Sequence, residues 1–484
     1  MATITEARDT FTPSQVPRPG RPPGRLAPVV RRASARVPAW WRDAVGVGTW
    51  LSLLVVVALW VAGGGLQEMG TVAGAFTSLG RLTGLLASDL LLIQVLLIAR
   101  IPMVERSYGS DELARRHPLV GFTSFTLMLA HLVAIVIGYA LTASLNPFVQ
   151  LWEMTVGYPG MLLAAAGTLL LVLVTVTSIR TAREKLRYES WHLLHLYAYL
   201  GVGLAIPHQL WTGQDFLSNP FATGYWWALW IAAAGAIVIW RIGVPVHRTL
   251  AHSLRVAAVV REGPDVVSVW MHGRNLSSMP VAAGQFFNWR FLSGPGWSRS
   301  HPYSLSAAPT DDTLRITVKD LGDGSHVLAD LTPGSRVVIE GPYGRMHAGV
   351  RTRQKVALLA SGIGISPLRA LLEDLPAAPG DVTLLYRARS EGDLVLRDEI
   401  EAIAARTGAR VFYLLGRRLP GRSSWLPEAA AAVTDAEALA QLVPDIADHD
   451  VFLCGATEWM DAARRAAIDC GVPAANIHDE CFSW

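Results

Sequence analysis

Cysteine is scarce in this chain, with three residues among 484. Cys454, Cys470 and Cys481 all lie in the C-terminal part, and none of them has the spacing of a metal-ligand set. This pattern excludes a disulfide-rich scaffold and indicates a reducing, cytoplasmic environment for that part. An excess of one charge is also missing, because the formal net charge is only +3, so a nucleic-acid partner is not expected.

Hydrophobic residues make up 51% of the chain and charged residues 17%, which is too polar for a protein that lies wholly in lipid. The two kinds of residue are separated along the sequence. The apolar excess lies between about residues 45 and 244, whereas most of the charge and the strand-like segments follow it. We therefore expect a membrane domain followed by soluble domains.

Residues 1–38 are rich in Pro, Arg, Ser and Thr, so we expect them to form a disordered cytoplasmic tail. Arg31 and Arg32 raise the alternative of a twin-arginine export signal. However, the apolar run from Val45 has no small-residue cleavage site after it, and further apolar runs follow.

Six apolar stretches of bilayer-spanning length predict a six-helix transmembrane domain over 39–250. They lie at about 45–64, 82–104, 119–143, 159–179, 191–210 and 225–245. The odd-numbered connections hold no Lys or Arg except Arg81, whereas the even-numbered ones are basic. Their basic residues are Arg100, Arg106, Arg115, Arg116, Arg180, Arg183, Lys185 and Arg187. The positive-inside rule then places the N-terminus, these two loops and the C-terminal half in the cytoplasm of a multi-pass cell-membrane protein.

Short Val-rich and aromatic segments occupy 251–349 and predict a small antiparallel β-barrel. From 350 to 484, apolar strands alternate with helical stretches, which predicts the parallel doubly wound sheet of a nucleotide-binding α/β domain. The expected barrel strands are Leu254–Val260, Val266–Met271, Phe286–Phe291, Leu314–Val318 and Arg336–Ile339. The expected sheet strands are Val356–Ala360, Val382–Tyr386, Val411–Leu415 and Val451–Cys454.

Five of the thirteen histidines fall on the third and fifth apolar stretches or at their ends: His117, His131, His192, His195 and His208. Polar side chains are costly in a bilayer and usually face a bundle interior or a cofactor. Structural hydrogen bonds between helices are the alternative interpretation. Matched pairs on two parallel helices favour haem, because each helix then offers an inner and an outer ligand.

The histidine spacing predicts which rings meet. Fourteen residues separate His117 from His131, which returns to within about 40° of the same helix face. Thirteen separate His195 from His208, which leaves an offset of about 140° that we expect Pro207 to reduce by distorting the helix. The predicted pairs are His117 with His195 near the cytoplasm and His131 with His208 near the outside. Each pair would ligate one six-coordinate b-type haem suited to electron transfer.

Three more polar residues of this domain have competing interpretations. His192 lies one turn before His195, so it either replaces it as a ligand or contacts a haem propionate. Arg81 holds an outer propionate, attracts an anionic acceptor or is a solvated interfacial residue. Asp89 lies on a proton path or makes a structural hydrogen bond to a neighbouring helix.

The segment His301-Pro302-Tyr303-Ser304-Leu305-Ser306 resembles the flavin motif of the ferredoxin–NADP reductase superfamily, in its ferric reductase and NADPH oxidase version. The resemblance covers nearly the whole chain. It implies that Tyr303 packs on the FAD isoalloxazine ring and that Ser304 offers a hydroxyl to the redox-active flavin nitrogen. Soluble reductases usually have Arg where this chain has His301, so Arg299 is a candidate for the missing charge.

Two glycine-rich segments are candidates for phosphate binding. Gly322-Asp323-Gly324-Ser325 precedes a helical stretch, so backbone amides and Ser325 suit the FAD pyrophosphate, with a plain hairpin turn as the alternative. Gly341-Pro342-Tyr343-Gly344 resembles the family's link out of the barrel. After it, the segment from Ala360 to Pro367 follows a predicted strand and opens a helix, where Gly362 and Gly364 let the backbone approach a dinucleotide pyrophosphate.

The residues after the second and third sheet strands favour NADPH over NADH. No acid stands at the end of the second strand to accept a hydrogen bond from an adenine ribose hydroxyl. Basic and hydroxyl side chains suited to a 2′-phosphate stand there instead: Arg387, Arg389, Ser390, Arg417 and Arg418.

The last motifs concern the nicotinamide. Cys454-Gly455-Ala456 resembles the family's Cys-Gly motif, which implies a place for Cys454 beside the nicotinamide, although a buried strand cysteine is the alternative. The chain ends in a segment similar to the family's acidic-aromatic terminus, whose ring covers the flavin until nicotinamide displaces it. Phe482 is the first candidate for this ring and Trp484 the second, and filling of a hydrophobic groove is the alternative.

Together these features predict an NAD(P)H-dependent oxidoreductase in the membrane. It would pass electrons from cytoplasmic NADPH through FAD and two b-type haems to an extracytoplasmic one-electron acceptor. Oxygen, giving superoxide, and ferric chelates are the expected acceptors. The alternatives are a membrane-anchored flavin reductase without transmembrane electron transfer and a haem-binding sensor.

Overall fold

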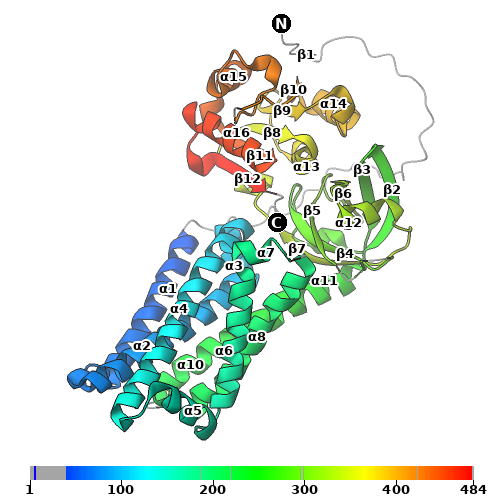
Figure 1. Ribbon diagram of the computed structural model, residues 1–484. Helices are drawn as coiled ribbons and strands as arrows, with labels where there is room; N and C mark the ends of the chain where they lie inside the picture. The colour runs from blue at the N-terminus through cyan, green and yellow to red at the C-terminus, as the bar shows by residue number, and fades with distance from the viewer. Residues whose placement is uncertain are drawn as a thin grey trace. The chain divides into compact units, whose positions relative to one another are not determined.

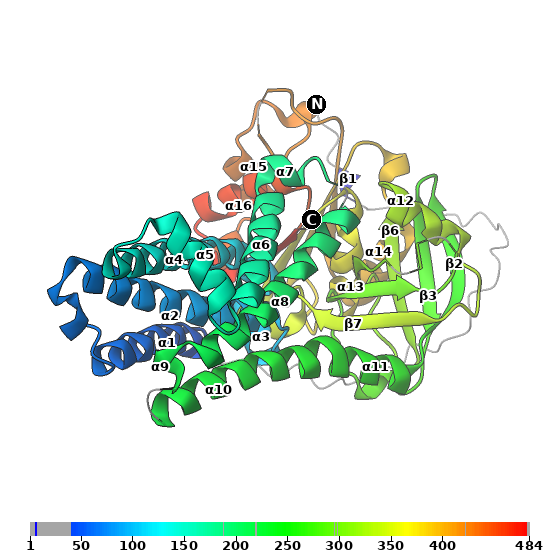
Figure 2. The same ribbon diagram turned by 60° about the horizontal axis from the view of Figure 1, so that its bottom comes forward.

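The computed structural model of the chain describes residues 5–6, 40–186, 188–217, 220–294, 296–297, 299–421 and 423–481. The chain divides into a helical unit (Pro38–Tyr108 and Glu112–Ile242) and a second unit (Met1–Val37, Gly109–Asp111 and Gly243–Trp484) that contains the β-sheets. Figures 1 and 2 show the elements of each. The tail predicted over 1–38 lies outside the described residues except for Thr5–Glu6, which form the two-residue strand β1.

The helical unit consists of long helices joined by short ones. The long helices are α1 (Trp40–Ala62), α2 (Val72–Ile98), α4 (Ser110–Ala143), α6 (Met161–Ser178), α8 (Tyr188–Trp211) and α10 (Pro220–Ala236). The short ones are η1 (Gln67–Gly70), α3 (Pro102–Tyr108), α5 (Pro147–Gly157), α7 (Arg180–Arg183) and α9 (Gln214–Leu217). After α10 follow the π-helical turn η2 (Ile237–Gly243) and α11 (Val244–His252).

Five of the described helices are long and apolar enough to cross a membrane. They are Trp40–Ala62, Val72–Ile98, Glu112–Ala143, Met161–Ser178 and Pro220–His252. The chain is therefore a multi-pass membrane protein. The remaining long helix, α8, has 24 residues, but it also contains three histidines, a glutamine and several aromatic residues, which lower its apolarity. The sixth span accordingly stays a prediction.

Glycines let α6 and α8 approach each other closely. A Cβ atom on Gly167 would lie 2.6 Å from the carbonyl oxygen of Gly201, and one on Gly201 would lie 3.0 Å from the carbonyl oxygen of Gly167. Small residues at a helix crossing bring backbones together where the hydrophobic effect does not drive association. This contact fixes α8, and with it the histidines that α8 bears.

The antiparallel part of the second unit contains all five strands predicted for a barrel, and one more. One sheet has the order β2 (Arg255–Gly263), β3 (Val266–His272), β6 (Thr313–Lys319), and the other the order β5 (His301–Ser304), β4 (Phe286–Phe291), β7 (Val337–Tyr343). Isolated bridges join Arg255 to Arg336 and Leu305 to Ile316. Because the strands form two separate three-stranded sheets, a closed barrel is not confirmed.

The α/β part confirms the predicted parallel sheet. The strand order is β1, β10 (Arg410–Leu415), β9 (Val382–Ala388), β8 (Lys355–Ser361), β11 (His449–Gly455), β12 (Ile477–Cys481), and all pairs are parallel except β1 with β10. Helices α13 (Ile365–Asp374) and α14 (Arg397–Thr407) share one core with the sheet, and α15 (Asp435–Leu442) and α16 (Thr457–Asp469) share another. Strand order reverses between β8 and β11, and the carboxyl ends of strands at such a point form the usual binding crevice of this fold.

Candidate functional site

Two pairs of histidines face each other between α4 and α8. The ring centres of His117 and His195 are 5.9 Å apart, and those of His131 and His208 are 6.4 Å apart. Two metal–nitrogen bonds of about 2 Å each, with about 1 Å from each nitrogen to its ring centre, require about 6 Å between two imidazoles that share an iron. The predicted pairs are therefore brought together at a spacing that fits iron. His208 reaches its partner in spite of the offset along α8, which has Pro207 inside it.

The outer pair is held by hydrogen bonds to Nδ1. Nδ1 of His131 lies 2.8 Å from the carbonyl oxygen of Gly80, which only accepts, so this nitrogen has the proton and Nε2 keeps its lone pair for a metal. A Cβ atom on Gly84 would lie 2.5 Å from the same Nδ1, so only glycine leaves room for the ring. The hydroxyl of Thr212 donates to the carbonyl oxygen of His208 and lies 2.7 Å from Nδ1 of His208, from which it accepts.

The inner pair is less completely held. Nδ1 of His195 lies 3.2 Å from the hydroxyl of Ser178, and the indole of Trp191 packs against the His195 ring at 5.1 Å between centres. Nδ1 of His117 is buried and has no hydrogen-bond partner among the described residues. In the same part of the chain, no group of three or more His, Cys, Asp or Glu side chains is arranged to hold a bare metal ion. The donor set thus fits an iron that receives its other ligands from a porphyrin.

Arg81 forms ion pairs with two carboxylates. Its Nε and Nη2 donate to Asp215 at 2.8 and 2.5 Å, and its Nη1 donates to Glu68 at 2.6 Å. Only 14% of the Arg81 side chain is exposed. These contacts do not leave its guanidinium open to a propionate or an anionic acceptor, because bidentate charge-assisted pairs would first have to open.

Asp89 joins three helices. It is fully buried on α2, and its Oδ1 accepts hydrogen bonds from Ser52 of α1 at 2.8 Å and Tyr225 of α10 at 2.9 Å. Its Oδ2 has no partner within the described residues. The two hydrogen bonds favour the structural interpretation of Asp89 over the proton path.

Two of the predicted flavin residues, His301 and Tyr303, lie on β5, and Gly324 contacts both. The rings of His301 and Tyr303 stack with 6.0 Å between centres, and the Tyr303 hydroxyl lies 3.5 Å from the carbonyl oxygen of Gly324. A Cβ atom on Gly324 would lie 2.4 Å from the His301 ring. Burial, together with the nearby carboxylate of Asp320, raises the pKa of Tyr303, so its hydroxyl stays protonated.

Ser304 offers an unused hydroxyl next to Tyr303. The residue is 4% exposed, and its Oγ is buried without a hydrogen-bond partner among the described residues. Buried hydroxyls are normally satisfied, so an unsatisfied one beside a flavin-type tyrosine fits a ligand that accepts or donates a hydrogen bond there. This observation supports the fit of FAD to the site.

Two predicted flavin ligands are used elsewhere. The Ser325 hydroxyl accepts from the amide of Leu321 at 2.8 Å and donates to the carbonyl of Gly322 at 2.9 Å, so it caps its own turn. The Ser306 hydroxyl accepts from Thr317 at 2.7 Å and from Nε of Arg315 at 3.0 Å. The structure does not direct either hydroxyl at the flavin residues, because short hydroxyl side chains are readily captured by local donors and acceptors.

The glycine-rich turn lies at the point where the strand order reverses. Gly362 has a φ of +55°, which favours glycine. A Cβ atom on Gly364 would lie 2.1 Å from the carbonyl oxygen of Cys454, so glycine lets this turn, η6 (Gly362–Gly364), contact the end of β11. Pro367 is buried in the first turn of α13. The turn and Cys454 therefore border the same crevice at the carboxyl ends of β8 and β11.

The basic residues predicted for a 2′-phosphate divide into two groups. Arg387 is 7% exposed and donates to the carbonyls of Ala388 and Leu414, so it faces inward, and burial lowers its pKa. Arg418 pairs with Glu458 at the surface. The contacts of Arg387 do not support the prediction that it binds the phosphate, because its guanidinium already donates to buried carbonyl groups.

Arg389 and Arg417 are exposed and have no ion-pair partner in the described part of the chain. Ser390 caps the turn η7 (Glu391–Asp393), with its hydroxyl 2.7 Å from the carboxylate of Asp393. Two free guanidinium groups suit a phosphate, whereas Asp393 is an acid that suits a ribose hydroxyl. The preference for NADPH therefore stays a prediction that depends on Arg389 and Arg417.

Glu480 lies next to the predicted site residue Cys454 and was not itself predicted as a site residue. β12 pairs with β11 so that Glu480 lies opposite Cys454, which is fully buried and has its Sγ 3.8 Å from the Glu480 carbonyl oxygen. Oε1 of Glu480 accepts from the amide of Arg345 at 3.2 Å, and a Cβ atom on Gly344 would lie 2.0 Å from it. The acid in the terminal motif was the available signal. Phe482 and Trp484 lie outside the described residues.

Comparison with known proteins matches both parts of the chain. Residues 83–206 match the family described as ferric reductase like transmembrane component, and residues 358–465 match the oxidoreductase NAD-binding domain. The chain is 33% identical over 209 residues to ferredoxin–NADP reductase B of Sorangium cellulosum, a match that covers 41% of this chain and 84% of that protein.

Two further relatives are reductase components of oxygenases. The chain is 35% identical over 206 residues to the ferredoxin reductase component of 3-ketosteroid-9-alpha-monooxygenase from Mycobacterium tuberculosis, which covers 42% of this chain and 54% of the relative. It is 28% identical over 243 residues to the glycine betaine monooxygenase reductase subunit of Chromohalobacter salexigens, which covers 48% and 64%. The chain thus spans between half and two thirds of the length of these two relatives.

The α/β crevice, the flavin-type tyrosine and serine and these matches define an NAD(P)H-dependent oxidoreductase. The C-terminal half of the chain belongs to the ferredoxin–NADP reductase family, and a ferric reductase-like transmembrane domain precedes it in the same chain.

Proposed function

We propose that the protein is a transmembrane oxidoreductase that passes electrons from cytoplasmic NADPH, through FAD and two b-type haems, to a one-electron acceptor on the other side of the membrane. Two facing pairs of imidazole rings support this most strongly. In each pair one ring comes from α4 and the other from α8, and the ring centres are 5.9 and 6.4 Å apart. These two pairs would hold one haem at each level, which would give an electron two successive sites along the helix axes.

The same pairing supports α8 as the sixth span. α4 is long and apolar enough to cross the bilayer, and α8 meets it at two levels about 20 Å apart. α8 therefore runs through the same depth of the membrane as α4, and its polar rings face α4 rather than lipid. Six spans put both ends of the chain on one side, which the basic loops assign to the cytoplasm.

The residues of the second unit orient the nicotinamide and the flavin. When bound, FAD would supply hydride acceptance and release of single electrons, and a haem would supply one-electron transfer. Tyr303 would pack against the flavin ring, and Ser304 would offer its hydroxyl to the ring's reactive nitrogen. Gly362 and Gly364 would admit the dinucleotide phosphates, and Cys454 would lie beside the nicotinamide.

The acceptor is oxygen or a ferric chelate, since both can accept one electron by outer-sphere transfer without binding to the iron of a haem held by His131 and His208. Movement of electrons outward is assisted by an inside-negative potential, by about 2.3 kcal/mol per charge for each 100 mV.

Anaerobic addition of NADPH to the purified protein tests this function. We expect the haem absorption bands to shift to those of the reduced state, and to return when oxygen or a ferric chelate is admitted. The acceptor that reoxidises the haems fast identifies the reaction. Protein that contains FAD but no haem would instead be a membrane-anchored flavin reductase, and haem that NADPH does not reduce would indicate a sensor.

A further inference from the structure

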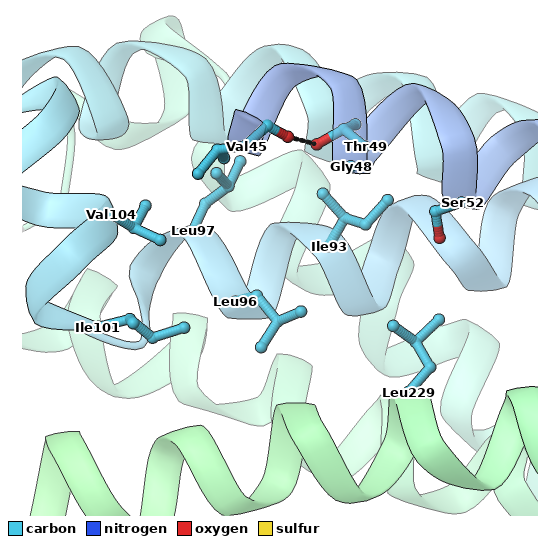
Figure 3. Close-up of a pocket in the computed structure, with 10 residues that line it drawn as sticks. All are labelled: Val45, Gly48, Thr49, Ser52, Ile93, Leu96, Leu97, Ile101, Val104 and Leu229. Carbon is cyan, nitrogen blue, oxygen red and sulfur yellow. Dashed lines mark hydrogen bonds between the residues drawn. The ribbon is translucent and has the colours of Figure 1, made fainter. Parts of the chain in front are cut away.

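A cavity of about 240 Å³ lies between α1, α2, α3 and α10 of the helical unit. Figure 3 shows apolar side chains around it, among them Ile93 and Leu96 of α2, Val104 of α3 and Leu229 of α10. On the α1 side the wall includes Gly48, where an added Cβ atom would meet no atom within 4 Å.

The polar atoms of this wall are already satisfied. The Thr49 hydroxyl donates to the carbonyl of Val45 at 3.0 Å, and the Ser52 hydroxyl donates to Asp89 at 2.8 Å. A bound water needs two to four polar partners, so these walls do not suit water. An apolar cavity of about 150 Å³ is large enough for benzene, so this one accommodates part of a hydrocarbon chain.

Positive charge lies at one end of the cavity. Val45 and Val104 mark that end in Figure 3, and Arg42 lies one turn before Val45 on α1, within about 60° of the same helix face. The Arg42 guanidinium lies 5.3 Å from the centre of the Tyr108 ring, and within the described residues it has no carboxylate at ion-pair distance. The Tyr108 hydroxyl donates to the Arg42 carbonyl at 2.7 Å, which ties α1 to α3 at this point.

The acids near this end do not cancel that charge. Glu105 pairs with Arg100 at 3.0 Å, and Glu112 pairs with Arg115 and Arg116 at 3.0 and 2.8 Å. Asp43 follows Arg42 in sequence, but successive residues on a helix point about 100° apart. An anion is thus favoured next to the mouth of an apolar cavity.

We infer that this groove binds one anionic phospholipid, with an acyl chain in the cavity and the phosphate at Arg42. Apolar walls without free polar groups select the chain, and the guanidinium group selects the phosphate, for which its donor geometry is well matched. Basic sites between membrane helices recognise anionic headgroups by the same physics. This site is separate from the histidine pairs and does not depend on haem.

Two substitutions separate the parts of the site. Gly48→Leu fills the cavity without a backbone clash, and Arg42→Gln removes a charge but keeps a polar side chain. Gly235→Leu on α10 is the matched control, because a Cβ atom there also meets nothing within 4 Å and Gly235 does not line the cavity.

Electron spin resonance of the full-length protein in phosphatidylcholine vesicles, with a trace of spin-labelled phosphatidylglycerol or spin-labelled phosphatidylcholine, provides the measurement. We expect the immobilised fraction to be several-fold larger for phosphatidylglycerol in the wild type and in Gly235→Leu. We expect Arg42→Gln to abolish this difference and Gly48→Leu to reduce the immobilised fraction for both labels. Equal immobilisation of the two lipids by the wild-type protein would overturn the inference, whether or not the variants fold.

Discussion

A histidine inside a bilayer costs free energy unless its ring nitrogens have partners. In this protein three of the rings have a hydrogen-bond partner at Nδ1, which offsets part of this cost. The partners are Gly80 for His131, Ser178 for His195 and Thr212 for His208. The centre of each of these rings lies 5.9 or 6.4 Å from the centre of a second histidine ring, a spacing that an iron can bridge. At the scale of the residue, the chemistry of the site is thus decided by which ring nitrogen keeps its proton.

Removal of one outer imidazole tests this assignment. We expect His131→Ala to lower the haem content from two per chain to one, because a single remaining imidazole holds iron weakly, while NADPH still reduces the flavin. The pyridine haemochrome assay gives the haem content. His272→Ala, at an exposed position on β3, is the control and keeps both haems. Two haems in a folded His131→Ala protein would show that His131 is not a ligand.

Ser304 is tested by removal of its hydroxyl. We expect Ser304→Ala to retain FAD but to slow flavin reduction by NADPH about tenfold or more, because a positioned hydrogen bond to the reacting group is lost. Stopped-flow absorbance of the flavin under anaerobic conditions gives the rate. Ser278→Ala, an exposed turn serine, is the control. An unchanged rate in Ser304→Ala would remove this residue from the site.

At the scale of the element, the turn η6 contacts β11 only because residue 364 is glycine. We expect Gly364→Ala to raise KM for NADPH at least tenfold and to destabilise the protein by about 2 kcal/mol, since its Cβ atom would overlap the Cys454 carbonyl. Steady-state kinetics and denaturant titration give the two quantities. Gly392→Ala is the control, because its Cβ atom would meet only Ser390 Oγ, at 3.9 Å. Parallel behaviour of the two variants would exclude close approach as the reason for Gly364.

The ends of β11 and β12 are joined by Asp450, which gives a pH dependence. Burial alone raises the pKa of Asp450, but hydrogen bonds from His478, Arg353, Asn476 and Thr352 outweigh it and hold the pKa at about 2. The unfolded value is about 3.9, so this stabilisation is complete above about pH 4 and is lost as the pH falls toward 2.

We expect Asp450→Asn to lower the free energy of unfolding at pH 7 by about 2 kcal/mol and to flatten its dependence on pH between 4 and 2. Denaturant titrations of the full-length protein at several pH values measure this. Asp445→Asn, whose carboxylate pairs with Lys355 at the surface, has a smaller effect. An equally steep acid dependence in Asp450→Asn would contradict the role of this carboxylate.

Strands and histidine pairs were predictable because they follow from local patterns. Short Val-rich and aromatic segments located β3, β4 and β6, and the matched histidine spacings located the ring pairs. The short strand β5 was not predicted, because Pro302 interrupts its run of strand-forming residues. The division of the antiparallel strands into two sheets was not predicted either. The inward turn of Arg387 was not predictable either, since it depends on the carbonyl of Leu414 in another strand. Long-range partners decide such features.

At the scale of the whole molecule, one chain combines a ferric reductase-like membrane domain with a reductase of the ferredoxin–NADP reductase family. In the proposed function, a hydride must be split into single electrons between the two, because nicotinamide gives up two electrons at once whereas a haem accepts one. FAD would be the cofactor that supplies this step. The proposal therefore requires that the membrane domain itself accepts electrons.

The central claim is that four imidazoles hold two haem irons. The most direct test measures the number of haems per polypeptide chain and the fraction of these haems that NADPH reduces without oxygen. The expected result is two low-spin haems per chain, both reduced by NADPH. One haem or none in folded protein that still binds FAD would contradict electron transfer across the membrane by this route.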